Sequence, residues 1–310
     1  MKTILITGAS GFLADKIFDS LMTLNKYKLV LGARDVEKIS SIDKFKSAEI
    51  RYFNLMDDSS YINALSGIDA VIHLAAMDYA DCEKNPELAW KVNVTMLEAF
   101  FLKCSLSGVK QFVYFSTFHV YGPNLEGVIT EETATNPINT YSKSHLDAEK
   151  IVLKSKSLEG IVIRLSNAIG IPLHRDSSAW KLVVNDLCSQ AIAKRKITLQ
   201  SSGKKVRDFI PASSIGQAID VLLEKNKFQK DNAIYNLGSG KSTSILEIAN
   251  IIQKECKSLL NFFPSLEANN QIPENNLSYV YSNQKISSLG FKLSVTLEKE
   301  IITILKNLYE

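Results

Sequence analysis

The stretch that decides the fold is Thr7-Gly8-Ala9-Ser10-Gly11-Phe12-Leu13-Ala14, between a short apolar run and an amphipathic segment. In a strand–turn–helix unit, a first glycine allows a tight turn and a second lets a pyrophosphate approach the backbone. A third small residue then lets helix and strand pack closely, and the helix N-terminus faces the phosphate charge. The spacing of Gly8, Gly11 and Ala14 therefore predicts a dinucleotide-binding turn, with Ser10, Phe12 and Leu13 beside the cofactor.

Short apolar runs alternate with amphipathic segments through the first half of the chain. We expect strands at 3–6, 28–31, 50–53, 70–74, 111–115 and 160–164, and helices at 12–24, 86–104 and 141–154. The runs lack period-two alternation, as is typical of parallel strands that are buried on both faces. The alternation predicts an α/β fold with a Rossmann-type, doubly wound parallel sheet.

The pattern becomes less regular after Arg164. Helices are expected near 180–193, 215–224, 245–256 and 297–308, with a strand near 196–199, and Asn and Ser are frequent between 261 and 288. We therefore expect a dinucleotide-binding domain at 1–165 and a smaller C-terminal α/β substrate lobe at 166–310, with segments that interleave.

Composition narrows the class of protein. The 310 residues are 45% hydrophobic, which is ample for a large core. The 36 basic and 33 acidic residues form no basic stripe, so a nucleic-acid partner is not expected. The four cysteines show no metal-ligand spacing, which predicts reduced structural thiols and no metal site. Neither a signal peptide nor a membrane-spanning run is recognised, so we expect a soluble, cytoplasmic protein.

The end of the second strand bears on the choice of cofactor. An acidic residue there would bind the ribose hydroxyls of NAD, but this chain has Gly32-Ala33-Arg34-Asp35. A guanidinium pairs well with a 2′-phosphate, so Arg34 favours NADP over NAD. Stacking of Arg34 on the adenine and simple exposure to solvent are the alternatives. Asp57 either reaches the adenine or caps a helix.

Further motifs follow in a fixed order. They are His73-Leu74-Ala75-Ala76, Asn93-Val94, the run from Phe115 to Gly122, Tyr141-Ser142-Lys143-Ser144-His145, Arg164-Leu165-Ser166-Asn167, Arg207-Asp208-Phe209-Ile210 and the run from Tyr235 to Gly240. Together they resemble the extended short-chain dehydrogenase/reductases, the NAD-dependent epimerase/dehydratase family, in its nucleotide-sugar-modifying branch. The likeness covers nearly the whole chain. It implies that Leu74, Ala75, Ala76 and Asn93 contact the cofactor, and that helices 86–104 and 141–154 form a homodimer interface.

The resemblance also implies the chemistry. Family members transfer hydride between NAD(P) and a sugar carbon, usually C4, of a nucleotide sugar. Tyr141 would exchange the hydroxyl proton, and Thr117 would hold the same oxygen. Asn167 would contact the diphosphate, and Arg207 a phosphate or the nucleotide ribose, because a guanidinium suits planar, bidentate contacts. A salt bridge from Arg207 to a nearby carboxylate such as Asp208 is the alternative.

His145 departs from the family pattern, which has a lysine there that lowers the pKa of the tyrosine. Residues four apart share a helix face, so His145 still lies beside Tyr141, whereas Lys143 points elsewhere. We expect His145 to replace the lysine and to contact the cofactor. A slow enzyme with a retained cofactor, a degenerate site that only binds, and a merely packed histidine are the alternatives.

His119 is the second departure. We expect Thr117 and His119 to point to the same side of a strand end. Phe118 and His119 stand where the family's 4,6-dehydratases usually carry Asp and Glu, which argues against a dehydratase. His119 is then an auxiliary proton carrier or a substrate contact, or else a structural histidine.

The sequence therefore predicts an NAD(P)-dependent nucleotide-sugar oxidoreductase, a 4-dehydrogenase or 4-keto reductase. A nucleotide-sugar 4-epimerase is the near alternative, because it performs the same hydride step twice. A non-catalytic binding protein and a reductase of small non-nucleotide substrates remain the alternatives from other classes.

Overall fold

The computed structural model describes residues 1–155, 157–224, 233–271 and 277–310. The Asn- and Ser-rich stretch between 261 and 288 therefore lies partly outside the described residues. None of the helices in these ranges is both long and apolar enough to cross a membrane.

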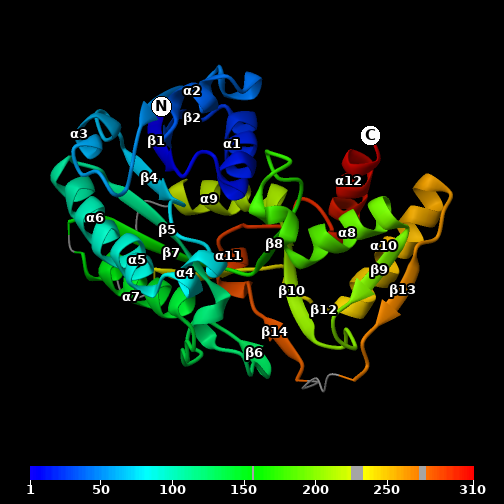
Figure 1. The fold of residues 1–310 in the computed structure, drawn as a ribbon. Coiled ribbons are helices and arrows are strands. Elements are labelled where there is room, and N and C mark those ends of the chain that lie inside the picture. Colours follow the sequence, from blue (N-terminus) through cyan, green and yellow to red (C-terminus); the bar gives the residue numbers. More distant parts are fainter. Residues whose placement is uncertain (156, 225–232, 272–276) are drawn as a thin grey trace.

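A seven-stranded parallel sheet forms the centre of the first half (Figure 1). Its strands are β1 (Lys2–Thr7), β2 (Tyr27–Ala33), β3 (Glu49–Tyr52), β4 (Ala70–His73), β5 (Gln111–Thr117), β7 (Glu159–Leu165) and β11 (Ile234–Leu237). Their spatial order is β3-β2-β1-β4-β5-β7-β11, so the winding reverses between β1 and β4. Doubly wound sheets bind ligands at the carboxyl ends of the strands at this reversal. The predicted fold class is confirmed.

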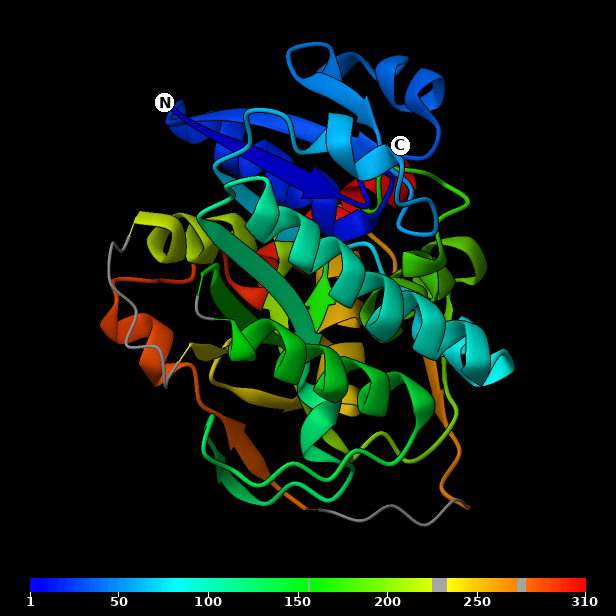
Figure 2. The same ribbon diagram turned by 90° about the vertical axis from the view of Figure 1, so that its left-hand side faces the viewer.

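Helices cover both faces of the sheet (Figures 1 and 2). One face packs against α1 (Phe12–Leu24) and α9 (Ile215–Glu224), and the other against α3 (Ser60–Ala64), α6 (Leu97–Leu106) and α7 (Thr140–Lys154). Along β1, Ile4 and Ile6 belong to the first core, whereas Leu5 belongs to the second. The inner strands are thus buried on both sides, which explains their apolar sequences, whereas the edge strand β3 is partly exposed.

The helix predicted at 86–104 is not regular. It consists of α5 (Pro86–Trp90), a π-helical segment (Lys91–Met96) and α6, and α4 (Tyr79–Lys84) precedes it. Single π-helical turns occur frequently at functional sites. This one carries Asn93 into the interior, so the expectation of one uniform helix was wrong in this detail.

The residues after β7 build a second lobe. A three-stranded sheet contains β8 (Asn167–Ile169), β10 (Val206–Pro211) and β12 (Ser242–Ser244), and a two-stranded one pairs β9 (Lys196–Leu199) with β13 (Ser265–Ala268). The lobe's core lies among α8 (Val183–Lys194), α10 (Ile245–Leu260) and α12 (Leu297–Tyr309). The helix expected from about residue 180 begins at Val183, because Trp180 lies in a preceding 3-10 turn.

Two elements from the second half return to the first. Helix α9 packs on α1, and β11 pairs with β7 at the edge of the large sheet. A small sheet of β6 (Gly127–Ile129) and β14 (Tyr279–Tyr281) also joins distant parts of the chain. The remaining short helices, α2 (Val36–Ser40) and α11 (Gln284–Ser288), lie against the large sheet's edges.

Candidate cofactor and catalytic site

The glycine turn after β1 is built for close approach. Gly8 has φ of 70°, and a Cβ there would lie 3.2 Å from the backbone nitrogen of Ala75. Gly11 donates its N–H to the carbonyl of Gly8 at 2.8 Å and stands at the N-cap of α1, where no side chain caps the helix. The first-turn N–H groups of α1 are therefore available to phosphate oxygens. These residues fit a dinucleotide.

Thr7 joins the ends of β1 and β4. Its hydroxyl lies 3.0 Å from Nδ1 of His73 and accepts from the backbone nitrogens of Leu74 and Ala75 at 3.1 and 3.3 Å. The predicted cofactor contacts at 8–13 and 74–76 consequently lie side by side, with Ala76 the most exposed of the second group. Sequence reasoning missed Thr7, although a buried polar residue at the end of an apolar strand was a signal.

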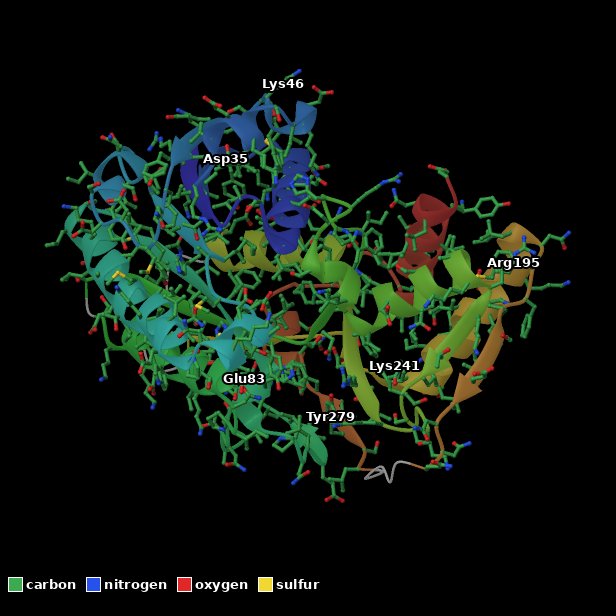
Figure 3. The ribbon with its side chains drawn as sticks, viewed as in Figure 1. Asp35, Lys46, Glu83, Arg195, Lys241 and Tyr279 are labelled. Carbon is green, nitrogen blue, oxygen red and sulfur yellow. The ribbon has the colours of Figure 1, made fainter. Side chains whose placement is uncertain are left out.

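Arg34 and Asp57 follow the ends of β2 and β3. Arg34 is exposed and makes no hydrogen bond or ion pair with any described residue. Its neighbour Asp35 caps α2 by accepting from the nitrogen of Lys38 at 2.9 Å (Figure 3). Asp57 accepts from both the nitrogen and the hydroxyl of Ser59, and these hydrogen bonds lower its pKa. Asp57 thus shapes the turn that precedes α3, but the N-cap of this helix is Ser59, and the contact of Asp57 with the adenine stays a prediction.

The side-chain amide of Asn93 is hydrogen-bonded within the protein. Its Oδ1 accepts from the nitrogen of Met77 at 2.9 Å, and its Nδ2 donates to Ser144 Oγ at 3.2 Å and Cys82 Sγ at 3.5 Å. These bonds hold the loop after β4 against α7. They support a positioning role, while the contact with the cofactor expected for Asn93 stays a prediction.

The four predicted catalytic residues come together. Thr117 ends β5, Tyr141 lies in the first turn of α7, and His145 lies one turn later. The rings of Tyr141 and His145 are 4.5 Å apart and those of Tyr141 and His119 6.2 Å apart. Burial raises the pKa of Tyr141 to about 12, although a hydrogen bond with Thr117 lowers it.

The reason given for the proximity of Thr117 and His119 was wrong. Strand β5 ends at Thr117, and His119 lies in a 3-10 turn, Phe118–Tyr121. The Thr117 hydroxyl accepts from the backbone nitrogen of His119 at 3.2 Å and lies 3.0 Å from its Nδ1. The capped turn, not strand alternation, therefore brings the two side chains together.

His145 does not supply the positive charge of a lysine. It is buried, and this burial lowers its pKa to about 3, so the imidazole is neutral at physiological pH. Its Nδ1 lies 2.7 Å from the hydroxyl of Tyr114, whereas its Nε2 is buried without a hydrogen-bond partner among the described residues. Lys143 is exposed, as expected. The unpartnered Nε2 also fits a site that receives a ligand.

A buried ion pair fixes α7 against the sheet. Glu149, two turns after Tyr141 on the same face, accepts from Ser116 Oγ at 2.5 Å and from Arg164 Nη2 at 2.7 Å. Arg164 also donates to the hydroxyl of Tyr121 at 2.9 Å. Sequence reasoning missed this network and Tyr114; a glutamate on the buried face of α7 was the signal.

The second lobe contributes a cation. Arg207 in β10 is half-buried. Burial lowers the pKa of His119 to about 4, and the positive charges of Arg207 and Lys205 act in the same direction. The alternative of an Arg207–Asp208 salt bridge is wrong, because neighbouring strand residues point to opposite faces. Asp208 instead accepts from Ser166 and Ser239.

Asn167 ties β8 to β10 by donating its Nδ2 to the carbonyl of Asp208 at 2.8 Å. Lys241 and Tyr279 lie on the second-lobe side of this region, and Glu83 of α4 lies on the side of the first half (Figure 3). Glu83 accepts from the backbone nitrogen of Tyr141 at 3.3 Å. Glu83 of the first half thus contacts Tyr141, and Arg207 of the second half acts on the neighbouring His119.

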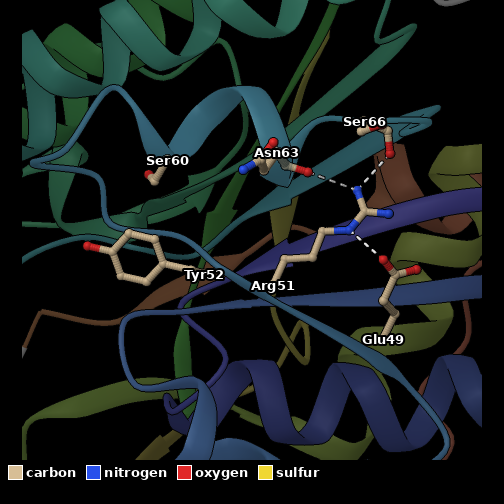
Figure 4. A pocket seen from close by; sticks show the side chains of 6 residues that line it. All are labelled: Glu49, Arg51, Tyr52, Ser60, Asn63 and Ser66. Carbon is tan, nitrogen blue, oxygen red and sulfur yellow. Dashed lines mark hydrogen bonds and ion pairs between the residues drawn. The ribbon is translucent and has the colours of Figure 1, made fainter.

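A surface recess of about 410 Å³ lies elsewhere, at the outer edge of β3 (Figure 4). It is lined by Glu49, Arg51, Tyr52, Ser60, Asn63 and Ser66. Arg51 donates to the carbonyls of Ala64 and Ser66 and to the carboxylate of Glu49. Its guanidinium is thus engaged within the protein, and the recess contains none of the predicted site residues.

A Rossmann-type sheet with a glycine turn and a Tyr–Thr pair beside it defines a dinucleotide-dependent enzyme class. The model of the NAD dependent epimerase/dehydratase family matches residues 4–238, and the chain belongs to this family. The predicted family and the prediction of an enzyme are confirmed.

Curated relatives span nearly the whole chain. The dTDP-D-glucose 4,6-dehydratase of Mus musculus is 27% identical over 97% of this chain and 86% of its own length. An uncharacterized UDP-glucose epimerase of Bacillus subtilis is 25% identical over 81% of both chains.

Solved structures share the fold. A UDP-glucose 4-epimerase of Thermotoga maritima superposes with a TM-score of 0.82 at 21% identity, covering 99% of this chain and 98% of its own. A UDP-glucuronic acid 4-epimerase of Bacillus cereus, solved with NAD and a fluorinated nucleotide sugar, gives a TM-score of 0.83 at 19% identity, with the same coverage.

Proposed function

We propose that this chain transfers hydride between NAD(P) and a sugar carbon, C4, of a nucleotide sugar, as a 4-dehydrogenase or 4-keto reductase. The observation that carries the proposal is the cluster of Thr117, His119, Tyr141 and His145 at the carboxyl edge of the sheet. This edge also holds the Gly8 turn. The relatives, which are named as nucleotide-sugar dehydratases and epimerases, agree with this activity.

Each side chain of the cluster has a task in the proposed reaction. The bound nicotinamide supplies the hydride chemistry. Tyr141 gives or takes the proton of the sugar hydroxyl, and Thr117 donates a hydrogen bond to the same oxygen. Because the pKa of Tyr141 is raised to about 12, its phenol is protonated at neutral pH and holds the proton that reduction of a ketone requires.

The second lobe would hold the nucleotide diphosphate. Arg207 makes no hydrogen bond or ion pair with a described residue, so its guanidinium is available to an anion. It faces His119 closely enough to affect the pKa of that ring. We therefore place a phosphate or the nucleotide ribose against Arg207, with Asn167 beside it. Residues 1–165 hold the cofactor in this proposal, and most of 166–310 surrounds the nucleotide sugar.

Replacement of Tyr141 by Phe tests the proposal. A panel of UDP- and dTDP-sugars, with NAD and NADP, is assayed for change in nicotinamide absorbance. We expect Tyr141→Phe to lower kcat by a factor on the order of 100 to 10,000, the usual contribution of general acid–base catalysis, with cofactor binding retained. Tyr79→Phe is the control, because Tyr79 is 52% exposed and its ring lies only 5.9 Å from that of Tyr141. Equal inertness of wild type and Tyr141→Phe, with cofactor bound, would favour the non-catalytic alternative.

The 4-epimerase remains the second candidate, because relatives with that name share the fold and cover the chain. An epimerase returns its hydride to the same sugar. Turnover without net change in nicotinamide absorbance, with a cofactor that copurifies, would therefore assign epimerisation. Elimination of water is not proposed, since Phe118 and His119 provide no carboxylate beside Thr117. If no nucleoside diphosphate raises the melting temperature, the small-substrate alternative gains instead.

Three further properties belong to the proposal. We propose NADP as the preferred cofactor, from the free guanidinium of Arg34. We also propose a reducing, cytoplasmic environment, because all four cysteines are buried and unpaired. A homodimer through α5, α6 and α7 is supported by Leu102 and Leu106, which are 59% and 75% exposed on α6. Small-angle scattering should give twice the chain's mass, and a monomeric mass would contradict the dimer.

A further inference from the structure

Tyr114 is a buried residue that the proposed chemistry leaves unused. It lies in β5, and its hydroxyl is 2.7 Å from Nδ1 of His145. In the described part of the chain this is the only hydrogen bond of that hydroxyl. A phenol has one proton to donate. The nearby carboxylate of Glu149 already accepts from Ser116 and Arg164. Nδ1 of His145 is therefore the acceptor that remains for the Tyr114 proton.

The tautomer of His145 follows from counting the groups left unsatisfied. If Nδ1 carried the proton, it would donate to Tyr114. The phenolic proton and the Nε2 lone pair would then both be buried without a partner among the described residues. If Nε2 carries the proton, Tyr114 donates to Nδ1, and only the Nε2–H lacks a partner. Unsatisfied buried polar groups are costly, so the second arrangement is favoured.

The second observation concerns the Nε2 atom of His145. It is fully buried and has no hydrogen-bond partner within the described ranges, in a side chain that is 3% exposed. Its ring contacts that of Tyr141, with centroids 4.5 Å apart. A donor held in this place needs an acceptor that the described protein does not provide, and a ligand bound against Tyr141 would supply one.

We propose that Tyr114 holds His145 in the Nε2–H tautomer, so that His145 donates one hydrogen bond to a hydroxyl oxygen of the ligand bound against Tyr141. The proposal rests on the proposed function, because it takes that ligand to be the dinucleotide or the nucleotide sugar. Tyr114 is a positioning residue here, since it acts through His145. The ribose of the cofactor and the sugar of the substrate both offer hydroxyl oxygens, and the experiment separates them.

The tautomer is measured first, in the ligand-free protein. Long-range proton–nitrogen spectra of ¹⁵N-histidine-labelled protein distinguish protonated from bare ring nitrogens, and His145→Phe assigns the signals. We expect Nε2 to be protonated and Nδ1 bare in the wild type, and the Nδ1–H form to appear in Tyr114→Phe. A wild-type His145 that is protonated at Nδ1, or at both nitrogens, overturns the proposal.

Binding is measured second, with NADP⁺ and UDP-glucose titrated separately into wild type, Tyr114→Phe and His145→Phe. We expect Kd to rise about tenfold in both variants for the ligand whose hydroxyl accepts, as one buried hydrogen bond warrants. Tyr61→Phe is the matched control, because Tyr61 is equally buried but donates to the carbonyl of Leu55 at 2.6 Å, away from the site. It should lower the melting temperature and leave both affinities unchanged.

The outcomes separate cleanly. Weakened NADP⁺ binding identifies the cofactor ribose as the acceptor, and weakened UDP-glucose binding identifies the sugar. Unchanged affinities for both ligands in both variants overturn the donor role of His145. If the wild type binds neither ligand, the proposed function fails and the donor role fails with it, while the spectrum still decides the tautomer. Loss of melting temperature alone would show a merely structural Tyr114.

Discussion

Arg34 is the residue on which the choice of nicotinamide cofactor depends. It is exposed directly after β2 and has no partner among the described residues. A free guanidinium there pairs with the 2′-phosphate that distinguishes NADP from NAD. We expect Arg34→Ala to raise Kd for NADP at least tenfold and to change Kd for NAD less than twofold, as measured by calorimetry. Lys38→Ala, which removes a cation from the next turn, is the control. Equal changes for the two cofactors would contradict the NADP proposal.

Single residues show what the sequence could and could not predict of the site. Tyr141 and His145 share a helix face because of their spacing alone, and Thr117 is adjacent through a strand end, so their meeting was predictable. The partner of His145 was not, because Tyr114 is 31 positions away and meets it only when α7 docks on β5. Asn93 was expected at the cofactor, but its bonds to Met77 and Ser144 depend on a π-helical turn that no spacing announces.

At the scale of elements, α7 carries Tyr141 and His145, and the Glu149–Arg164 pair fixes it to the sheet. Both charges are buried, with side chains 2% and 5% exposed. Removing one charge leaves the other unpaired in the interior, which costs about 3–5 kcal/mol. We expect Glu149→Gln to lower the free energy of unfolding by about that amount, as measured by urea denaturation.

Asp147→Asn on the same helix is the matched control for this change. The Asp147–Lys150 pair is exposed, and such pairs contribute about 0–1 kcal/mol. The Glu149–Arg164 pair would lose its assigned role if the two variants were equally stable.

The network around Glu149 could not be predicted from the sequence, because Ser116, Glu149 and Arg164 come from three separate elements. The elements themselves were predicted.

At the scale of the whole molecule, the buried His73 and His145 and the half-buried His119 make stability depend on pH. Burial lowers the pKa of His73 to about 3, of His119 to about 4 and of His145 to about 3. In the unfolded chain their pKa values return to about 6.5. The unfolded state therefore takes up more protons as pH falls below 6.5, and stability falls by up to about 1.4 kcal/mol per pH unit for each histidine.

We expect the melting temperature to fall between pH 7.5 and pH 5.5, measured in low salt without ligand. His73→Gln removes one of the three groups and should make the decline less steep. Glu131, Asp208 and Glu300 act with the opposite sign, since burial raises their pKa and the folded state then gains protons in acid. They offset part of the decline. A melting temperature that does not change over this interval would contradict the buried neutral histidines.

Much of the molecule's architecture was predictable, because parallel strands buried on both faces leave long apolar runs in the sequence. The strands near Ile4, Val71 and Val113 are of this kind. The short strands β6, β8, β12 and β14 were not predicted, since each has three residues and its neighbours come from remote parts of the chain. The return of β11 to the large sheet had no local signal either.

That return has a consequence for folding during synthesis. Strand β7 gains its outer neighbour only when residues 234–237 arrive, about seventy positions after β7 itself has ended. A growing chain would present an unpaired strand edge for this interval, and such edges template aggregation. Loop closure over this separation is also slow, which places the pairing late on the folding pathway. We therefore expect chaperone binding and misassembly to concentrate at the pairing of β7 with β11, where the second half of the chain completes the large sheet.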